Sequence, residues 1–375
     1  MKKKVYISVI NDLVTDQRVH RIAKTICDSG YSVTIIGRRL RNSKPCEFRS
    51  IRVKRFRLIF NKGFLFYASF NIRLFLFLFT RQGSRVYISN DLDTLPANFL
   101  ASRFRPAKLV YDSHEYFTEV PELMGRKFVK NFWKGLERML VPRVNAAYTV
   151  NDSLAKMYSA KYGIEFGVIR NVPDGHIDEE AFLIPDEYSK HDFIIYQGSV
   201  NKDRGLEEML EIMVENNNYK LVIAGDGDVI DVLKRKAKNL GIENRVLFVG
   251  QLRPRNLRWL TKQAALGISL EKKTNLNYYY ALPNKIFDYI YGGIPVLCSG
   301  FPEMRKIVQG YDVGTIVDPD SREEIQKSLE YMLGTTEARE KWKENTRVAA
   351  RELNWKNEQN KLISIYKKVG IEIQL

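Results

Sequence analysis

Short apolar stretches and amphipathic helical stretches alternate along almost the whole of this 375-residue chain. Near the amino terminus, the apolar residues 5–10 are followed by residues 18–29, in which apolar side chains recur every three or four positions until Gly30 ends the pattern. Strands that alternate with helices build parallel sheets, because each helix carries the chain back to the end of the sheet where the next strand begins. The sequence therefore predicts an α/β protein with doubly wound parallel sheets.

The alternation runs twice, with a break between the two series. Residues 171–192 (NVPDGHIDEEAFLIPDEYSKHD) hold two prolines, a glycine and many charges without periodicity, as a linker does. A chain of this length also suits two domains that each bury a core. We therefore predict two Rossmann-like domains facing a cleft, residues 1–172 and 173–354. The strands expected in the first are 5–10, 32–37, 51–56, 86–89, 109–112, 147–150 and 168–170, and those expected in the second are 193–197, 221–224, 246–248, 266–270, 295–298 and 315–317.

Positive charge is concentrated in the first half of the chain. Residues 1–170 contain 31 Lys and Arg against 13 Asp and Glu, whereas the remaining residues contain 29 against 31. A generally basic proteome would raise the net charge without confining the excess to one half. One-sided basicity indicates an anionic partner, and three classes stay open: a nucleic acid, a membrane surface or a phosphorylated acceptor.

The cysteine content indicates a reducing compartment. Cys27, Cys46 and Cys298 are too few and too scattered for a disulfide framework or a metal cluster. The basic N-terminus leads into the strand expected at 5–10 and lacks the apolar core and cleavage site of a signal peptide. We therefore expect a cytoplasmic protein.

Basic and aromatic residues are interleaved between residues 49 and 85 (RSIRVKRFRLIFNKGFLFYASFNIRLFLFLFTRQGSR). The apolar run 63–80 is as long as a short membrane span, but Asn71 and Arg73 in its middle argue against spanning. Two partly compatible interpretations stay open: a core helix with a basic edge, and an interfacial helix that docks on anionic lipid. Similar runs line grooves for single-stranded nucleic acid, but no known nucleic-acid module surrounds this one, and we expect no nucleic-acid partner.

The stretch 281–296 (ALPNKIFDYIYGGIPV) carries polar residues that helix capping does not explain. A small-residue turn leads into a short helix, which ends at Gly292-Gly293 before a buried strand. Asn284 and Lys285 stand at the N-terminus of that helix, where backbone amides and a cation suit a phosphate. Asp288, about one turn further on, suits sugar hydroxyls. The set fits a nucleoside diphosphate, and a packing helix with a polar face fits this segment equally well.

A second segment, 196–209 (YQGSVNKDRGLEEM), opens the second domain. Gly198 allows a tight turn, and Arg204 precedes a helix N-terminus, where its guanidinium can bind phosphate oxygens in pairs. Gly225, in AGDGD, also suits a turn near a nucleotide. Alone, an arginine beside a strand end is an ordinary surface residue. The strand ends of one sheet, however, bring the Arg204 and Lys285 loops to the same edge, which favours a phosphate site.

Together these segments resemble the retaining glycosyltransferases of family four, in the subgroup whose donor motif reads PNK, then aromatic, acidic and Tyr residues before Gly-x-Pro-Val. The resemblance covers nearly the whole chain. It implies the GT-B fold, in which a C-terminal helix, here at about 355–375, packs back on the N-terminal domain. It also implies a nucleotide-sugar bound by the C-terminal domain and an acceptor bound by the N-terminal domain. We expect no metal and no other cofactor.

The resemblance assigns roles within the donor site. Arg204 stands where family members carry a basic residue that contacts the donor diphosphate. A second family arginine, in a GRL triplet, is absent from Gly198-Ser199-Val200, so Lys202 or Lys285 is expected to compensate. Asp288 stands at the ribose-binding acid of the family's acidic pair, and Tyr280 replaces the other acid, so we expect Tyr278–Tyr280 to line the sugar pocket. The predicted donor-binding residues are Gly198, Arg204, Gly225, Tyr280, Asn284, Lys285 and Asp288.

The segment DSHE, residues 112–115, follows a predicted strand. His114 therefore lies where ligands of α/β proteins bind, and no second histidine stands at metal-ligand spacing. The resemblance implies a histidine here near the donor sugar. The predicted catalytic residues are therefore His114, Arg204 and Lys285. Glu115 is expected either to orient the imidazole or to face the acceptor.

Two loops of the first domain are candidates for the acceptor side. Asp16 is expected to cap the helix that follows it, and with Arg18 it faces the acceptor by the resemblance. In NDLDTLP, residues 90–96, the pair Asp91 and Asp93 has the spacing of a metal-binding motif from a different glycosyltransferase fold. We expect instead that Asp91 caps a turn and that Asp93 caps the helix starting at Thr94. The predicted acceptor-side residues are Asp16, Arg18, Asp93 and Glu115, and no metal ligand is predicted.

These observations predict a glycosyltransferase of the hexosyltransferase type that moves a sugar from a nucleotide-sugar to an acceptor with retention of anomeric configuration. The acceptor is expected to be anionic or lipid-linked, as in surface-polysaccharide assembly, and the basic first domain is expected at the inner face of the membrane. Two alternatives stay open: a nucleotide-sugar epimerase of the same fold, and a non-enzymatic module that binds membrane or nucleic acid.

Overall fold

The computed structural model describes residues 3–46, 48, 50–83, 85–175, 179–189 and 192–372. The chain divides into two compact units: unit 1 comprises Met1–Asn171 and Glu358–Leu375, and unit 2 comprises Val172–Asn357. The first domain was predicted to end at residue 172, one residue later than unit 1 does before the chain enters unit 2. The second domain was predicted to end at residue 354, three residues earlier than unit 2 does. Parts of the predicted linker (176–178 and 190–191) and of the predicted C-terminal helix (373–375) lie outside the described residues.

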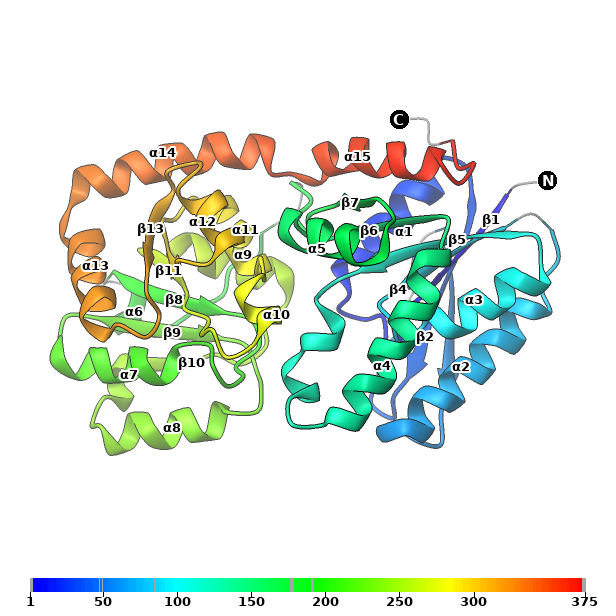
Figure 1. Ribbon diagram of the computed structural model, residues 1–375. Coiled ribbons are helices and arrows are strands. Elements are labelled where there is room, and N and C mark those ends of the chain that lie inside the picture. The colour runs from blue at the N-terminus through cyan, green and yellow to red at the C-terminus, as the bar shows by residue number, and fades with distance from the viewer. Residues whose placement is uncertain are drawn as a thin grey trace. The chain divides into compact units, whose positions relative to one another are not determined.

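Unit 1 is built on a parallel sheet of seven strands in the order β3-β2-β1-β4-β5-β6-β7 (Figure 1). β1 pairs with both β2 and β4, so that Val5 is level with Val33 on one side and Val86 on the other. The direction of winding reverses between β1 and β4, as in doubly wound folds. The strands are β1 Lys4–Ser8, β2 Ser32–Arg39, β3 Arg52–Arg57, β4 Arg85–Asn90, β5 Ala107–Ser113, β6 Ala146–Thr149 and β7 Phe166–Val168.

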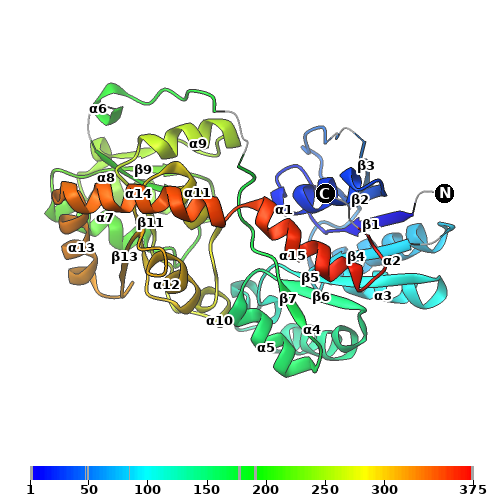
Figure 2. The ribbon, with the colours of Figure 1, turned by 90° about the horizontal axis from the view of Figure 1, so that it is seen from above.

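The last helix of the chain, α15, packs in unit 1 beside α1 (Figure 2). Nε2 of Gln359 donates a hydrogen bond to Oγ1 of Thr25 on α1 over 2.8 Å, and the hydroxyls of Tyr366 and Tyr148 lie 2.9 Å apart. The helices of unit 1 are α1 Gln17–Asp28, α2 Gly63–Phe79, α3 Leu95–Phe104, α4 Lys127–Leu140, α5 Asp152–Tyr162 and α15 Trp355–Lys367, with 3₁₀ turns η1 Phe117–Glu119, η2 Pro121–Leu123 and η3 Val141–Arg143.

Helix α2 has one buried apolar face and one exposed apolar face. One face is buried in the core of unit 1, through Phe66, Phe70, Leu74 and Leu78. The opposite face leaves apolar side chains between 53 and 70% exposed, at Phe64, Leu65, Ile72 and Leu76. The core interpretation therefore holds for one face only. Within the part of the chain that the structure describes, every helix is too short or too polar to cross a membrane.

Unit 2 repeats the plan with six parallel strands in the order β10-β9-β8-β11-β12-β13. Alternate residues of β8 join different hydrophobic clusters: Phe193 and Ile195 pack with α11 and α14, whereas Ile194 and Tyr196 pack with α7, α8 and α13. The sheet is therefore covered on both faces, as parallel sheets are. Its strands are β8 Phe193–Gln197, β9 Lys220–Ala224, β10 Val246–Phe248, β11 Leu266–Ser269, β12 Val296–Ser299 and β13 Gly314–Val317.

The helices of unit 2 include a short one inside the predicted linker. That helix, α6, carries Tyr188, which packs with Ile184 and Val172 in the core of unit 2, so this stretch is anchored and does more than connect. The helices are α6 Asp186–Ser189, α7 Leu206–Glu215, α8 Ile230–Asn239, α9 Pro254–Gln263, α10 Leu276–Tyr279, α11 Asn284–Gly292, α12 Pro302–Val308, α13 Arg322–Gly334 and α14 Thr336–Glu352, with the 3₁₀ turn η4 Glu243–Arg245. The predicted fold of two doubly wound parallel sheets is confirmed. Each predicted strand overlaps an observed one, although the strand predicted at 168–170 shares only Val168 with β7.

Candidate active site

The loops after β8 and β9 in unit 2 approach each other closely, and glycine makes this possible. Gly198 directly follows β8 with a φ of +119°, and Gly225 directly follows β9. A Cβ on Gly225 would lie 1.8 Å from the carbonyl oxygen of Gly198, so no side chain fits there. A Cβ on Gly198 would lie 3.7 Å from Cε of Lys285. The two loops therefore form one bare backbone surface beside Lys285.

The predicted phosphate-binding residues Arg204 and Lys285 meet at one carboxylate. Nζ of Lys285, on the first turn of α11, lies 2.8 Å from Oε1 of Glu271, and Nη1 of Arg204 lies 3.2 Å from the same oxygen. The Glu271 side chain is fully buried, whereas those of Lys285 and Arg204 are 8 and 19% exposed. Two cations around one carboxylate leave a net positive charge, which suits a bound anion.

Two serine hydroxyls also donate hydrogen bonds to Glu271. Its Oε2 accepts a hydrogen bond from Oγ of Ser269 over 2.7 Å, and its backbone carbonyl accepts one from Oγ of Ser299 over 2.7 Å. Burial alone would raise the pKa of Glu271, but the charges of Lys285 and Arg204 lower it to about 2. Glu271 is therefore ionised at neutral pH. The sequence analysis missed this residue, although its position two residues after the end of a buried strand was a usable signal.

Aromatic rings lie against both cations. Cζ of Arg204 is 4.4 Å from the centre of the Tyr278 ring, and Nζ of Lys285 is 4.2 Å from the centre of the Tyr196 ring. Tyr280, predicted to line the sugar pocket, is the C-cap of α10, and its ring packs on that of Tyr279. Lys202, the other candidate to replace the missing arginine, is exposed. Lys285 is therefore the candidate that shares a partner with Arg204.

Asp288 lies one turn along α11 from Lys285 and is connected to β8 through Gln197. Nε2 of Gln197 donates a hydrogen bond to Oδ2 of Asp288 over 2.8 Å, and Oε1 of Gln197 accepts one from Oγ1 of Thr261 over 2.7 Å. Asn284, the first residue of α11, is exposed. The structure thus places five predicted donor-site residues at the carboxyl edge of one sheet: Gly198, Arg204, Gly225, Lys285 and Asp288.

In unit 1, the predicted residues Arg18 and His114 meet at Asp112, near the end of β5. The buried Arg18 binds both carboxylate oxygens of Asp112 through Nε and Nη2, over 2.7 to 3.2 Å. Its Nη1 donates to the carbonyl oxygen of Ile169 over 2.7 Å. Nε2 of His114 lies 3.2 Å from Oδ2 of Asp112. Arg18 therefore reaches His114 through the Asp112 carboxylate.

Two more polar side chains hold the imidazole of His114. Nδ1 lies 3.4 Å from Oδ2 of Asp91, and Nε2 lies 3.1 Å from Oδ1 of Asn90. Burial alone would lower the pKa of His114, but the charges of Asp91 and Asp112 raise it to about 9. Burial alone would raise the pKa of Asp112, but Arg18 and His114 lower it to about 2. At neutral pH, His114 is therefore a cation that donates hydrogen bonds.

The predicted capping role of Asp93 is wrong. Helix α3 begins at Leu95 with Thr94 as its N-cap, and the amide of Ala97 donates to Oδ1 of Asn71 on α2 over 3.1 Å. Asn71 also donates to the backbone oxygen of Asp93 over 2.8 Å, so it occupies the capping position. Asp93 is buried, and within the described residues its Oδ1 has no hydrogen-bond partner. Burial, followed by the charge of Asp91, raises its pKa well above the usual range.

Three more acidic residues of unit 1 that the sequence analysis named are Asp16, Asp91 and Glu115. Asp16 caps α1 as predicted, since its Oδ1 accepts the amide of Val19 over 3.0 Å. Asp91 has a φ of +57°, and its Oδ1 accepts the amide of His114 over 2.8 Å, so it binds the loop after β5. Glu115 is exposed next to His114. The predicted acceptor-side residues Asp16, Arg18, Asp93 and Glu115 therefore all belong to unit 1.

Two family models match consecutive parts of the chain. The model described as Glycosyltransferase Family 4 matches residues 16–179, and the model described as Glycosyl transferases group 1 matches residues 178–349. The second match falls entirely within unit 2, which holds Arg204, Glu271 and Lys285.

Curated relatives carry the names of glycosyltransferases. The alpha-monoglucosyldiacylglycerol synthase of Streptococcus pneumoniae is 27% identical over 106 residues, which are 28% of this chain and 23% of that protein. The GalNAc-alpha-(1->4)-GalNAc-alpha-(1->3)-diNAcBac-PP-undecaprenol alpha-1,4-N-acetyl-D-galactosaminyltransferase of Campylobacter jejuni is 24% identical over 207 residues, 54% of either chain. The chain therefore spans less than two thirds of the length of each of these relatives.

Solved structures of glycosyltransferases share the fold over the whole chain. Sucrose-phosphate synthase from Thermosynechococcus elongatus matches with a TM-score of 0.81 at 14% identity and covers 99% of both chains. Anabaena HepE, solved in complex with UDP-glucose, matches with a TM-score of 0.72 at 14% identity, covering 97% of this chain and 99% of that one. The chain therefore combines a family-four domain and a group 1 domain of glycosyltransferases on the GT-B fold that these structures share.

Proposed function

We propose that this protein transfers a sugar from a nucleotide-sugar to an acceptor, and that unit 2 holds the donor. The main observation is the meeting of Arg204 and Lys285 at the buried Glu271, beside a backbone surface without side chains. Cations held in place with free backbone nearby suit the oxygens of a diphosphate. The fold shared with HepE, whose structure contains UDP-glucose, also supports a nucleotide-sugar donor.

In the proposed reaction, the bond between the anomeric carbon and the diphosphate oxygen breaks, and the electron pair leaves with the diphosphate. An acceptor hydroxyl oxygen forms the new bond to that carbon, and its proton passes to the leaving diphosphate oxygen. Arg204 and Lys285 stabilise the charge that develops on the leaving diphosphate. Since Glu271 already holds both cations, little rearrangement accompanies the reaction. We propose no metal ion or other cofactor, because these side chains supply the positive charge.

The remaining donor contacts are assigned by their positions around the two cations. Asp288, on the same helix as Lys285, would accept hydrogen bonds from ribose hydroxyls, and Gln197 would keep its carboxylate oriented. The amides near Gly198, Gly225 and Asn284 would contact the diphosphate. Tyr280 would lie against the sugar. Transfer of a hexose with retention of anomeric configuration is proposed from the resemblance to family four.

In unit 1, we assign His114 a positioning role. Its pKa of about 9 makes it a poor proton acceptor at neutral pH, so it would donate hydrogen bonds to an oxygen of the donor sugar or of the acceptor. The acceptor side would be shaped by four residues of unit 1, namely Asp16, Arg18, Asp93 and Glu115. Arg18 would act through Asp112, since it is buried and bonded to that carboxylate.

We further propose that the acceptor is lipid-linked and that unit 1 contacts an anionic membrane. The two curated relatives named above act on lipids according to their names, one on a diacylglycerol and one on an undecaprenol-linked sugar. Helices α2, α3 and α4 are neighbours in unit 1 (Figure 1). Their exposed apolar side chains form a surface that is here called the docking face. These are Phe64, Leu65, Ile72, Leu76, Phe79, Leu100, Phe104, Phe128, Phe132 and Met139.

The charges on these three helices favour an anionic surface. Their single acidic residue, Glu137, is fully buried and paired with Lys161. Exposed basic residues flank the apolar ones, namely Arg73 on α2, Arg103 on α3 and Lys127 on α4. Apolar side chains bordered by cations suit the headgroup region of a membrane that contains anionic lipids. We place this contact at the inner face of the cell membrane.

Purified protein should be titrated with UDP-, GDP- and ADP-sugars by calorimetry and then assayed for nucleoside diphosphate release with a membrane lipid extract. Donor binding and acceptor-dependent release are expected. Conversion of the nucleotide-sugar without any acceptor would indicate an epimerase instead. A protein that binds no nucleotide would be a non-enzymatic module, and the proposed function would then be wrong.

A further inference from the structure

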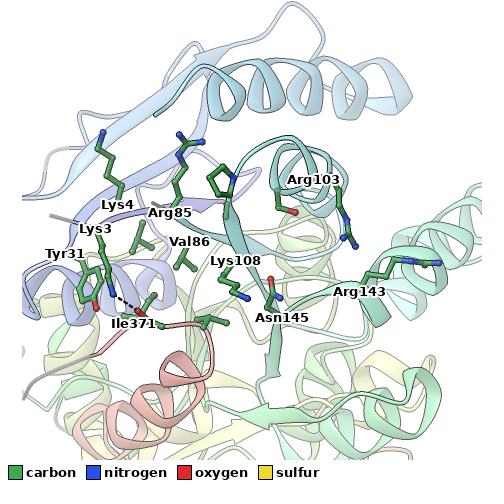
Figure 3. Close-up of a pocket in the computed structure, with 16 residues that line it drawn as sticks. Lys3, Lys4, Tyr31, Arg85, Val86, Arg103, Lys108, Arg143, Asn145 and Ile371 are labelled. Atoms are coloured by element: carbon green, nitrogen blue, oxygen red, sulfur yellow. Dashed lines mark hydrogen bonds between the residues drawn. The ribbon is translucent and has the colours of Figure 1, made fainter. Parts of the chain in front are cut away.

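A cavity of unit 1 away from the His114 cluster opens at the amino ends of β1, β4 and β5 (Figure 3). Its volume is about 520 Å³. Lys108 lies at the start of β5 and Asp112 near its end, so about 13 Å of strand separates the cavity from the His114 cluster. The cavity is therefore a separate site at the opposite edge of the same sheet.

The charged side chains that line this cavity are all basic. Six of its 16 described lining residues are Lys or Arg, and none is Asp or Glu. They come from the start of β1, the start of β4, the last turn of α3, β5 and the 3₁₀ turn η3, so they are distant in sequence and gathered by the fold. These residues are Lys3, Lys4, Arg85, Arg103, Lys108 and Arg143.

The hydrogen-bond partners of these cations are neutral. Nζ of Lys3 donates to the carbonyl oxygen of Gly370 over 3.2 Å (Figure 3), and Nζ of Lys4 donates to that of Gln82 over 3.1 Å. Arg143 donates to a carbonyl oxygen, and the guanidinium of Arg103 lies 4.7 Å from the centre of an aromatic ring.

Arg85 is the most buried of the six. It is 4% exposed, Nη1 lies 3.3 Å from the hydroxyl of Tyr87, and Nε has no hydrogen-bond partner within the described residues. None of the six forms an ion pair with a described carboxylate, whereas Arg18, Arg204 and Lys285 each do. Cations gathered around a cavity without carboxylates repel one another, and a bound anion would relieve that repulsion.

The rest of the lining suits a small organic anion. Tyr31, Ser102 and Asn145 contribute polar groups, and Val5, Val86 and Ile371 contribute apolar surface. A cavity of this volume is in the range of small-molecule sites. We propose that it binds a compound with at least two phosphate charges, at a site separate from the one that transfers the sugar.

The wall of this cavity includes the chain segment after α15. Ile371 is fully buried, and its amide donates to the carbonyl oxygen of Tyr366 over 3.0 Å. Lys3 reaches the same segment through Gly370. A bound phosphate compound would therefore contact both ends of the described chain and stabilise unit 1 against unfolding.

Tripolyphosphate is the probe, titrated by calorimetry at low salt in the presence of saturating UDP, which occupies the proposed donor site. Lys108 and Arg143 are exposed, so the variant Lys108→Ala/Arg143→Ala removes two charges from the cavity without cutting into the core. The matched control, Lys54→Ala/Arg57→Ala, removes a Lys and an Arg from exposed positions of β3 in the same unit. Thermal unfolding of the full-length protein provides the second readout.

One equivalent of tripolyphosphate is expected to bind the wild type and the control with the same affinity, within about twofold, and to raise the unfolding temperature. The cavity variant should lose at least tenfold in affinity. Equal losses in the cavity variant and the control would show diffuse attraction to a basic surface and would overturn the assignment. Unchanged affinity in the cavity variant, or binding that is lost when UDP is present, would overturn it as well.

Flotation with lipid vesicles distinguishes two sources of the phosphate, a lipid headgroup and a dissolved compound. Vesicles of phosphatidylcholine with and without phosphatidic acid are floated with the otherwise wild-type protein, the cavity variant and the control, all three carrying Ile72→Glu/Leu76→Glu so that the docking face does not contribute. Loss of flotation in the cavity variant alone would identify the phosphate as that of a lipid headgroup. Equal flotation of all three, together with the calorimetric difference, would identify a dissolved phosphate compound.

Discussion

Nζ of Lys285 and Oε1 of Glu271 lie 2.8 Å apart, although the two residues are 14 positions apart in the chain. The contact joins the first turn of α11 to the loop after β11, and Arg204 brings the loop before α7 to the same oxygen. One buried carboxylate therefore sets the distance between two cations from different loops. In the absence of a donor it also acts as their counter-ion.

Loss of either cation is expected to slow the reaction. Arg204→Ala and Lys285→Ala should each lower kcat/KM by about 100-fold, because each removes a positive charge from the leaving diphosphate. The measurement is release of nucleoside diphosphate with an acceptor present. Lys202→Ala removes an exposed cation from the loop that carries Arg204 and should stay within about twofold of the wild type. Wild-type turnover in Arg204→Ala or Lys285→Ala would contradict the proposed role.

The same two substitutions should interact in their effect on stability. Each single variant leaves Glu271 with one cation, whereas Arg204→Ala/Lys285→Ala leaves an unpaired charge that is fully buried. The double variant is expected to lose about 3–5 kcal/mol of unfolding free energy, clearly more than the sum of the singles. Urea unfolding of all variants measures this, and adding Glu271→Gln to the double variant should recover part of the loss. Additive losses would mean that the carboxylate is not shared.

The stability of unit 1 is expected to depend on pH through His114. The charges of Asp91 and Asp112 raise its folded pKa to about 9, above the unfolded value of about 6.5. A raised pKa gives stability that is complete below pH 6.5 and is lost as pH rises toward 9, here ~3 kcal/mol at most. Urea unfolding between pH 6.5 and 9 measures the loss, and His114→Asn should abolish it.

A histidine whose pKa is lowered and not raised provides the control for that experiment. Burial is the largest influence on the pKa of His20 and lowers it. His20→Asn should therefore leave the fall in stability between pH 6.5 and 9 intact. A wild-type protein with constant stability over this range, or an equal response to both substitutions, would contradict the charge state assigned to His114.

The docking face is expected to bind anionic vesicles. Ile72→Glu/Leu76→Glu places two negative charges at side chains that are 60 and 53% exposed, so the fold should persist while flotation with phosphatidylglycerol vesicles is lost. Val232→Glu, at a 46% exposed position of unit 2, adds a charge without touching this face and should float like the wild type. Equal flotation with neutral and anionic vesicles at low salt would count against electrostatic docking.

Most strands could be predicted because they are apolar runs bounded by polar or turn residues, whereas β3 (RVKRFR) is mostly basic. Parallel sheets bury both faces of a strand, so segments such as 193–197 read as continuous apolar stretches, and the structure places β8 at those residues. Helix ends followed the same local rules, as Asp16 at the start of α1 shows. Local sequence therefore determined most of the architecture.

Contacts between distant residues were the part that the sequence did not reveal. Glu271 was missed because its importance depends on two cations that arrive from other loops. Asp93 was misassigned because Asn71, 26 residues before Ala97, takes over the capping of α3. The proximity of Arg204 to Lys285 was predicted correctly, since both follow strands of one parallel sheet and such strand ends meet at one edge.

Unit 1 is assembled from both ends of the polypeptide, since residues 358–375 join residues 1–171, whereas unit 2 is one uninterrupted stretch. During synthesis on the ribosome, unit 2 has all of its residues before unit 1 has its final helix. Tyr148 and the surrounding surface that α15 covers stay exposed to solvent until Tyr366 has been synthesised. The order of translation therefore makes the N-terminal half of this protein the last to mature, and a nascent chain halted before residue 358 would expose it to chaperones.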